Sequence, residues 1–409
     1  MASADEASLI APELRATTLR GMPGFFRAGQ DEAGQWWMLD PRGEKFWIKC
    51  VHGLRAAAPQ GDGVLPPDPA TQLRRWGFNS AASAAQNSSA GRDDGLPFLA
   101  TADFSRAGRL ISAAGLRLPD VFDPRWKQLA GAHALEACHA WADCRELIGW
   151  MTDDALLWAQ PSLAGRPSLL QQCLSLEPSY AAYHAAWEFV LALHNGRIET
   201  LAQAWNAPLA NKEMVRELTR AEEGFGTRGY LRDEARWTRE FARRYFTTTA
   251  AALRAADPNH LVFGCRFPSP AGAHVLAECV YPAVDVAMPC WTELPAPTER
   301  PLHPVLAGDV CWVGPEFLRP VNAKREGRLT TVERMLRRAR SSLARLARHP
   351  AVVGYAWSEW QDEPREQPPF ARGLIHTNGV EAIEHTEMLV PFNRRAEALR
   401  RMPRSNSLP

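Results

Sequence analysis

Short apolar runs alternate with helical or polar stretches along most of the chain. A strand buried on both faces is a short, nearly continuous apolar run, whereas an amphipathic helix spaces its apolar residues three and four positions apart. Eight candidate strands of the first kind end in polar or aromatic residues, and helical patterns separate most of them. This alternation predicts a parallel sheet of βα units. The eight segments are 46–51, 78–83, 96–102, 147–151, 260–264, 284–288, 303–308 and 351–357.

The stretches around these segments complete the predicted architecture. Asp40-Pro41-Arg42-Gly43 has the composition of a tight turn and predicts a hairpin ahead of the first strand. The region from about 161 to 257 is helical and aromatic, and it follows the fourth strand. Residues 331–350 predict a helix with one apolar face, and we interpret its many arginines as the solvated face of that helix.

We therefore predict an α/β fold: a single (β/α)8 TIM barrel with an N-terminal hairpin and a helical insertion after strand four. The barrel domain is expected to span residues 23–402, between an N-terminal tail (1–22) and a C-terminal tail (403–409). A doubly wound sheet is the competing architecture. Such sheets usually carry a glycine-rich phosphate motif after the first strand, and this sequence has neither of the two common forms.

Composition excludes several classes of protein. Apolar residues at 46% and charged residues at 23% are typical of a globular enzyme. A net charge of +1 gives no reason to expect a nucleic-acid partner or an anionic membrane. The eight cysteines are scattered without a C-x-x-C pair, which argues against a structural zinc and a disulfide framework. The start of the sequence has no secretion-signal pattern and no long apolar span, so we expect a cytoplasmic protein.

Carboxylates and indoles gather where the candidate strands end. In a barrel these carboxyl ends form the active site, so the residues there are candidates as a set. They favour carbohydrate chemistry over a Ser-His-Asp triad, a metal or a cofactor, and the 15 tryptophans fit either a sugar-stacking site or a large core. The set is His52, Asn79, Asp103, Asp153, Asp154, Arg266, Trp291, Asp309, Trp312, Trp357, Glu359 and Trp360. Trp357 and Trp360 are three apart, so a regular strand points at most one of them squarely into the pocket.

The order of several motifs resembles the clan A glycoside hydrolases, above all the β-agarases. The hairpin WWMLDPRGEKFWIKCVHGL is similar to the entry into the agarase barrel, and IGWMTDD is similar to its fourth strand. IETLAQAWNAPLAN resembles a segment shared with clan A β-galactosidases, while HPVLAGDV and VVGYAWSEWQDEP resemble the seventh and eighth strands. The likeness runs from about Trp36 to Arg400. It implies a barrel that acts on a short, galactose-type oligosaccharide or glycoside.

The sequence departs from that family at both catalytic positions. The resemblance implies an acid/base Glu after strand four and a nucleophilic Glu after strand seven. Here Asp153-Asp154-Ala155 stands where the family reads Asp-Asn-Glu, and Gly308-Asp309 stands where it reads Gly-Glu. Two carboxyl groups are needed because one protonates the leaving oxygen while the other attacks the anomeric centre or activates water.

Three explanations remain open. In the first, Asp154 and Asp309 are the working pair, and the shorter side chains suit an inverting mechanism with its wider carboxyl spacing. In the second, a different rim carboxylate is the acid, with Glu359, Glu293 and Glu316 as candidates. In the third, the barrel is catalytically inactive and binds a saccharide or a protein partner.

Several candidates also have a structural interpretation. Asp153 and Asp154 can cap the helix that follows them, because Asp is favoured at helix starts. Arg266 can pair with Asp154 or Asp309 instead of a sugar hydroxyl, whereas a carboxylate at Asp309 favours a site because burying it unpaired is costly. Glu188 and His194 in the helical region are expected to be surface or packing residues. We predict catalysis by Asp309 and Asp154, with the remaining rim residues (His52, Asn79, Asp153, Arg266, Trp291, Trp312, Trp357, Glu359 and Trp360) binding substrate.

Overall fold

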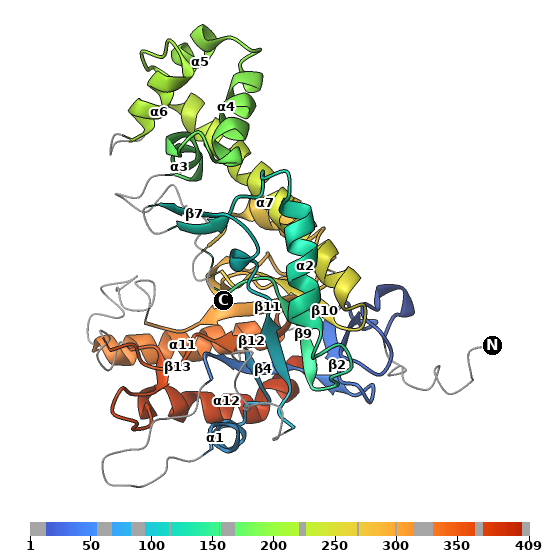
Figure 1. Cartoon of the computed structure of the whole chain (residues 1–409). Coiled ribbons are helices and arrows are strands. Elements are labelled where there is room, and N and C mark those ends of the chain that lie inside the picture. The colour runs from blue at the N-terminus through green and yellow to red at the C-terminus, as the bar shows by residue number, and fades with distance from the viewer. Residues whose placement is uncertain are drawn as a thin grey trace, which may run out of the picture.

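The chain has a mixed α/β structure around a curled, parallel, seven-stranded sheet (Figure 1). The computed structural model describes residues 14–54, 68–82, 95–113, 116–154, 156, 168–220, 226–267, 270–298, 301–313, 330–364 and 371–402. The strand order is β10-β9-β6-β5-β4-β12-β11. These strands are β4 (Ile48–His52), β5 (Ser80–Ala82), β6 (Phe98–Thr101), β9 (Leu147–Met151), β10 (Leu261–Gly264), β11 (Val305–Val310) and β12 (Val352–Trp357).

The two outer strands, β10 and β11, are connected by the segment 285–290. The N–H of Val286 donates to the Val262 carbonyl of β10 at 3.2 Å, and the N–H of Leu306 in β11 donates to the Ala287 carbonyl at 2.8 Å. A second parallel bridge joins Cys290 to Gly308. The strand predicted at 284–288 is therefore a set of isolated bridges. Pro289, which has no N–H for a regular ladder, follows it directly.

A three-stranded antiparallel sheet precedes β4. It contains β1 (Arg27–Gln30), β2 (Trp36–Leu39) and β3 (Lys45–Phe46), and β2 and β3 flank the turn in which the N–H of Gly43 donates to the Asp40 carbonyl. The sequence predicts one strand over 46–51, but the chain changes sheets at Trp47. Residues 14–22, assigned to the N-terminal tail, pair with this sheet through bridges from Leu14 and Arg20; residues 1–13 and 403–409 lie outside the described residues.

Helices cover the outside of the main sheet, and a group of helices between β9 and β10 extends away from it (Figure 1). In this group α3 packs on α4, α6 and α7, and the long α7 returns along α2 to the sheet. The helices are α1 (Pro69–Arg75), α2 (Trp126–Cys138), α3 (Leu169–Ser175), α4 (Ala181–Leu193), α5 (Ile198–Trp205), α6 (Lys212–Arg220), α7 (Arg228–Ala256), α8 (Ala273–Val275), α11 (Thr331–Arg348) and α12 (Ile383–Arg401). Short helical turns lie at η2 (Ala16–Thr18), η3 (Phe104–Arg106), η4 (Leu276–Val280) and η5 (Trp291–Glu293).

Two small sheets were not predicted from the pattern of apolar runs. One is the antiparallel pair β7 (Leu110–Ala113) and β8 (Leu116–Pro119), which follows β6. The other is the parallel pair β13 (Glu359–Gln361) and β14 (Gly373–Ile375), which follows β12. The second pair places Glu359 at the end of the last strand of the main sheet.

The alternation of side chains along the strands divides the core in two. In β4, Ile48 and Cys50 belong to a cluster inside the curled sheet, whereas Val51 belongs to the larger cluster between the sheet and its helices. Trp36 and Met38 of β2 join the inner cluster, so the antiparallel sheet covers the amino ends of the parallel strands. The carboxyl ends lie at the opposite edge.

Arg400 of α12 connects three elements at the amino ends of the parallel strands. Its side chain is fully buried, and its guanidinium donates to the carbonyls of Ala347 at 3.1 Å, His349 at 3.0 Å and Trp36. One cation therefore joins α12, the end of α11 and β2.

Replacing Arg400 with leucine is expected to lower the free energy of unfolding by about 3 kcal/mol or more, because buried carbonyls lose charge-assisted partners. Chemical denaturation measures the change. Arg401→Leu, at the exposed neighbouring position, is the control and is expected to change stability by less than about 0.5 kcal/mol. Equal losses in both variants would contradict the assigned role.

Candidate functional site

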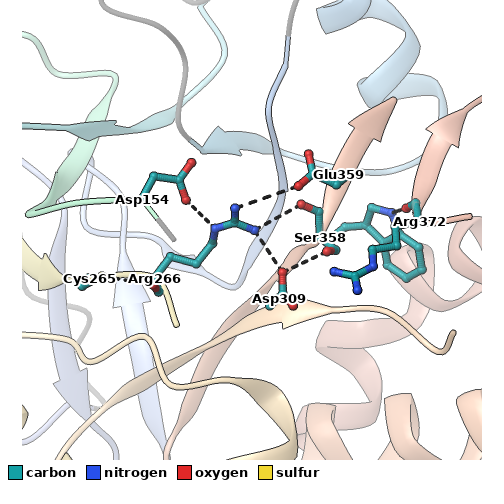
Figure 2. A network of polar contacts seen from close by, with 8 residues as sticks. Asp154, Cys265, Arg266, Asp309, Ser358, Glu359 and Arg372 are labelled. Carbon is teal, nitrogen blue, oxygen red and sulfur yellow. Dashed lines mark hydrogen bonds and ion pairs between the residues drawn. The ribbon is translucent and has the colours of Figure 1, made fainter. Parts of the chain in front are cut away.

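Four charged side chains meet at the carboxyl ends of the parallel strands (Figure 2). Asp154 follows β9, Arg266 follows β10, Asp309 lies in β11 and Glu359 follows β12. The Arg266 guanidinium hydrogen-bonds Asp154 through Nε, lies 3.0 Å from Asp309 Oδ1 through Nη1, and lies 3.9 Å from Glu359 Oε1 through Nη2. A single cation thus contacts carboxylates from three strand ends. We call Asp154, Arg266, Asp309 and Glu359 the carboxylate cluster.

The backbone directs Asp309 into this cluster. Its φ of +53° is in the left-handed region, and the pairing register between β11 and β12 shifts between Ala307 and Val310. Aspartate is one of the few non-glycine residues that adopt this conformation readily. Asp309 Oδ1 accepts hydrogen bonds from Arg266 and from Ser358 Oγ at 2.9 Å, whereas Oδ2 accepts none from the residues that the structure describes.

The Glu359 side chain lies beside Gly53, which directly follows β4 and has no side chain to displace it. A Cβ on Gly53 would lie 3.2 Å from Glu359 Oε2, and its φ of +72° also favours glycine. Burial raises the pKa of Glu359 to about 7; the charge of Arg266 lowers it and those of Asp154 and Asp309 raise it. The Glu359 side chain is 28% exposed and that of Asp309 is 7% exposed, so Glu359 lies nearer to solvent.

His52 completes this end of the sheet. It ends β4 and is buried, and burial followed by the charge of Arg266 lowers its pKa to about 3. The imidazole is therefore neutral at ordinary pH and can donate or accept a hydrogen bond without adding charge.

The four tryptophans predicted at the site are all buried. Trp312 and Trp357 are fully buried with ring centroids 4.6 Å apart, and Trp312 Nε1 donates to His385. Trp360 packs against Trp76, and Trp291 is 8% exposed. Trp312 and Trp357 also contact His385, so each of these rings has aromatic neighbours, and their predicted role in substrate binding stays a prediction.

Asn79 is also placed differently from the prediction. It precedes β5 and therefore lies at the amino end of that strand. Its Oδ1 accepts from the Lys49 N–H at 2.8 Å, and its Nδ2 donates to the Trp47 carbonyl at 2.9 Å. Asn79 connects the starts of two strands and does not belong to the carboxylate cluster.

The remaining candidates have other surroundings. Asp153 is buried beside Asp154 with partners of its own, and Glu293 accepts the N–H groups of Ala271 and Gly272. His194 lies 2.7 Å from Asp233 inside the helical group, in keeping with a packing role. Ala155, the position of the family acid, and Glu316 lie outside the described residues.

Two polar residues at the cluster were missed by the prediction. Ser358 bonds Asp309, and Figure 2 shows the Arg372 guanidinium directed toward Asp309. Ser358 directly follows the last apolar run, so its position at a strand end was an available signal. Arg372 lies just before the short strand β14, which the pattern of apolar runs does not predict.

All eight cysteines are free thiols. Within the described residues, no three His, Cys, Asp or Glu side chains gather in a way that could hold a metal ion. No helix among these residues is long and apolar enough to span a bilayer.

The fold can be compared with solved structures. An exo-β-agarase superposes with a TM-score of 0.65 at 15% identity, covering 95% of this chain and 67% of the agarase chain. A second agarase gives a TM-score of 0.61 at 18% identity, covering 97% of this chain and 70% of its own. The chain has a clan A glycoside hydrolase-like fold. No protein-family model and no curated protein matches the sequence.

The carboxylate cluster surrounds the buried Arg266 guanidinium, so replacing Arg266 tests how much this charge contributes to stability. Arg266→Met is expected to lower the free energy of unfolding by about 3–5 kcal/mol, since carboxylates lose their counter-charge in a buried place. The loss should be larger at pH 8 than at pH 5. Without the cation the folded-state carboxyl pKa values lie higher than the unfolded ones, so stability falls as pH rises through them.

Denaturant unfolding at the two pH values measures this difference. Arg340→Met, at an exposed position on α11 away from the cluster, is the control. A uniform loss at both pH values in the Arg266 variant would show that packing, and not charge, dominates.

Proposed function

We propose that the chain hydrolyses O-glycosidic bonds of a short, galactose-type oligosaccharide or glycoside. The observation that carries the proposal is the meeting of three carboxylates on one guanidinium at the carboxyl ends of the strands, where barrel enzymes build their active sites. The agarases of similar fold support the galactose-type substrate. We also infer that the main sheet and the bridged segment 285–290 close a complete (β/α)8 barrel.

Asp309 is assigned the attack on the anomeric carbon, directly or through a water molecule. Its Oδ1 accepts hydrogen bonds from Arg266 and Ser358, which orient the carboxyl group and place a cation beside it. Its Oδ2 is left for the reacting centre. The carboxylate therefore has the charge and the fixed orientation that a nucleophile or base requires.

Glu359 is favoured as the proton donor over Asp154. A donor must hold a proton at working pH, and the pKa of Glu359, raised to about 7, meets this requirement. Asp154 hydrogen-bonds the Arg266 guanidinium directly, whereas Glu359 lies 3.9 Å from it, so Glu359 is less closely paired with the cation. Asp154 then contributes charge and substrate contacts, and it remains the donor in the alternative pairing with Asp309.

One observation favours a second candidate function, a barrel that binds a saccharide without cleaving it. Arg266 lies between Asp154 and Asp309, and its guanidinium neutralises both. Incubation with aryl glycosides and galactan oligosaccharides, read by product formation and by calorimetry, separates the two. Binding without turnover across the panel would support the second function.

Asp309→Asn is expected to lower turnover by about 10²–10⁴ while leaving the fold intact, because it removes the charge and keeps the size. Steady-state kinetics on a cleaved substrate, with circular dichroism for folding, tests this. Asp285→Asn is the control, because Asp285 pairs with Arg254 and does not belong to the carboxylate cluster. Full turnover in the Asp309 variant would rule out its catalytic assignment.

The pH dependence of kcat/KM distinguishes Glu359 from Asp154. An acid must be protonated, so activity should fall as pH rises above about 7, the value to which the pKa of Glu359 is raised. Glu359→Gln should remove this basic limb and spare substrates whose leaving group needs no proton. If Asp154→Asn removes the limb and Glu359→Gln leaves it, Asp154 is the donor.

A further inference from the structure

The Glu359 carboxyl group is carried by a very small sheet. β13 and β14 have three residues each, and Glu359 is the first residue of β13, where it pairs with Gly373 of β14. Two short strands are a marginal structure by themselves, because the few backbone hydrogen bonds between them do not offset the loss of chain freedom. Side-chain contacts are therefore needed to hold β13 against β14.

One side chain, that of Asp362, contacts both ends of β14. Asp362 directly follows β13 and is 3% exposed. Its Oδ1 accepts the N–H of Gly373, the first residue of β14, at 2.7 Å, and its Oδ2 lies 2.7 Å from Nδ1 of His376, which follows β14. Its own N–H donates to the Ile375 carbonyl at 2.9 Å. The register of the strand pair is thus fixed through one buried carboxyl group.

Gly373 allows the two strands to approach this closely. A Cβ at Gly373 would lie 2.2 Å from the Asp362 backbone nitrogen and 2.6 Å from Asp362 Oδ1. Both distances are far shorter than van der Waals contact, so any side chain at this position would push the strands apart. Asp362 and Gly373 together determine how β13 lies against β14, and therefore where Glu359 begins.

His376 extends this contact to the last helix. Its Nε2 lies 3.4 Å from Glu384 Oε1 of α12, and its N–H donates to the Val380 carbonyl at 2.8 Å. The imidazole therefore lies between two carboxyl groups, those of Asp362 and Glu384. Three side chains in sequence connect the end of β13, the end of β14 and the start of α12.

The β13–β14 pair in turn determines the surroundings of Glu359. Glu359 Oε1 lies 3.9 Å from the Arg266 guanidinium, and its Oε2 lies beside Gly53 at the end of β4. A shift of β13 along β14 would change both separations and the burial of the carboxyl group. Asp154 and Asp309 extend from β9 and β11, so their contacts with Arg266 are made without β13.

We propose that Asp362 is a positioning residue, which through the β13–β14 pair sets where the Glu359 carboxyl group lies relative to the Arg266 guanidinium. The inference rests on the proposed hydrolase function only for the role of Glu359 as proton donor. Without the Asp362 carboxyl group, β13 is free to shift and the Glu359 side chain moves toward solvent.

The pKa of Glu359 reports where its carboxyl group lies. Burial is the largest influence and raises this pKa to about 7. The charged groups that face it are Arg266, which lowers the pKa, and Asp154, Asp309 and Glu363, which raise it. A Glu359 side chain released toward water loses the largest influence, so its pKa should fall toward the ordinary glutamate value of about 4.3.

Carbon-13 NMR of protein labelled at the glutamate carboxyl carbons measures this pKa without any substrate. The resonance absent from Glu359→Gln identifies Glu359, and Asp362→Leu should move its titration to lower pH by about one unit or more. Gly373→Ala disturbs the same contact from the opposite strand and should move the titration in the same direction. Asp362→Asn keeps an acceptor for the Gly373 N–H and should move it less than Asp362→Leu.

A second buried Asp–His pair is the matched control. Asp257 Oδ2 lies 2.7 Å from His260 Nδ1, and Asp257 Oδ1 accepts the N–H of Asn259 at 3.0 Å. This pair lies between α7 and β10, at the amino end of β10. Asp257→Leu should lower the Tm, as Asp362→Leu does, and leave the titration of Glu359 unchanged. Equal shifts of the titration in the two variants would overturn the proposal.

Turnover tests the consequence for catalysis. Asp362→Leu should lower kcat/KM by up to about 100-fold, the cost of a misplaced group, and move its basic limb to lower pH together with the Glu359 titration. Asp362→Asn should recover part of both. If Glu359→Gln leaves the basic limb in place, the proton-donor assignment fails, and the NMR titration still tests the position of Glu359.

An unchanged Glu359 titration in Asp362→Leu, Asp362→Asn and Gly373→Ala would show that the positioning role is wrong, whatever the turnover. If Asp362→Leu does not fold, Asp362→Asn and Gly373→Ala decide the question by the same titration.

Discussion

The buried charge of Arg266 is the constraint on which this end of the molecule depends. A guanidinium that is 8% exposed is costly to bury without anionic partners, and three strand ends supply them. Each carboxylate would in turn be costly to bury without the cation. The positions of Asp154, Asp309 and Glu359 are therefore mutually dependent, and a change at one strand end is transmitted electrostatically to the other two.

This arrangement places neighbouring carboxyl groups in different surroundings. Asp309 and Asp154 contact the cation closely, Glu359 lies farther from it at 3.9 Å, and Asp153 accepts hydrogen bonds from Ser105 and Tyr245 instead. Burial raises the pKa of Glu359 to about 7, so the carboxyl group farthest from the cation is the one in the cluster that holds a proton most readily near neutral pH. Separation of this kind is how one site can supply an acid and a base at the same pH.

Much of the architecture could be predicted because buried parallel strands are recognisable as short apolar runs. The runs ending at Asp154, Asp309 and Glu359 also placed these carboxylates at one edge, since parallel strands share an edge. The tryptophans could not be placed, because an indole at a strand end packs as well under an aromatic neighbour as against a sugar. Asn79 was misplaced because β5 starts at Ser80, two residues after Phe78, so Asn79 precedes the strand and does not follow its apolar part.

The contacts between strands could not be predicted from the sequence. Nothing in the local pattern indicates that the Asp153 carboxyl accepts the Ser105 N–H after β6 and the Tyr245 hydroxyl of α7, because these contacts depend on register and on the packing of α7. Likewise, the β13–β14 pair that fixes Glu359 is too short to produce a recognisable alternation.

The left-handed backbone at Asp309 limits which residue types fit at this position. A glutamate at this position would need more than a pocket for one extra methylene, because the conformation favours Asp, Asn and Gly over longer side chains. A glutamate here would strain this backbone or change the irregularity in β11, and with it the pairing of β11 with β12. Asn and Gly suit this backbone as well as Asp does, but both are uncharged, so the conformation favours the short carboxylate over any longer one.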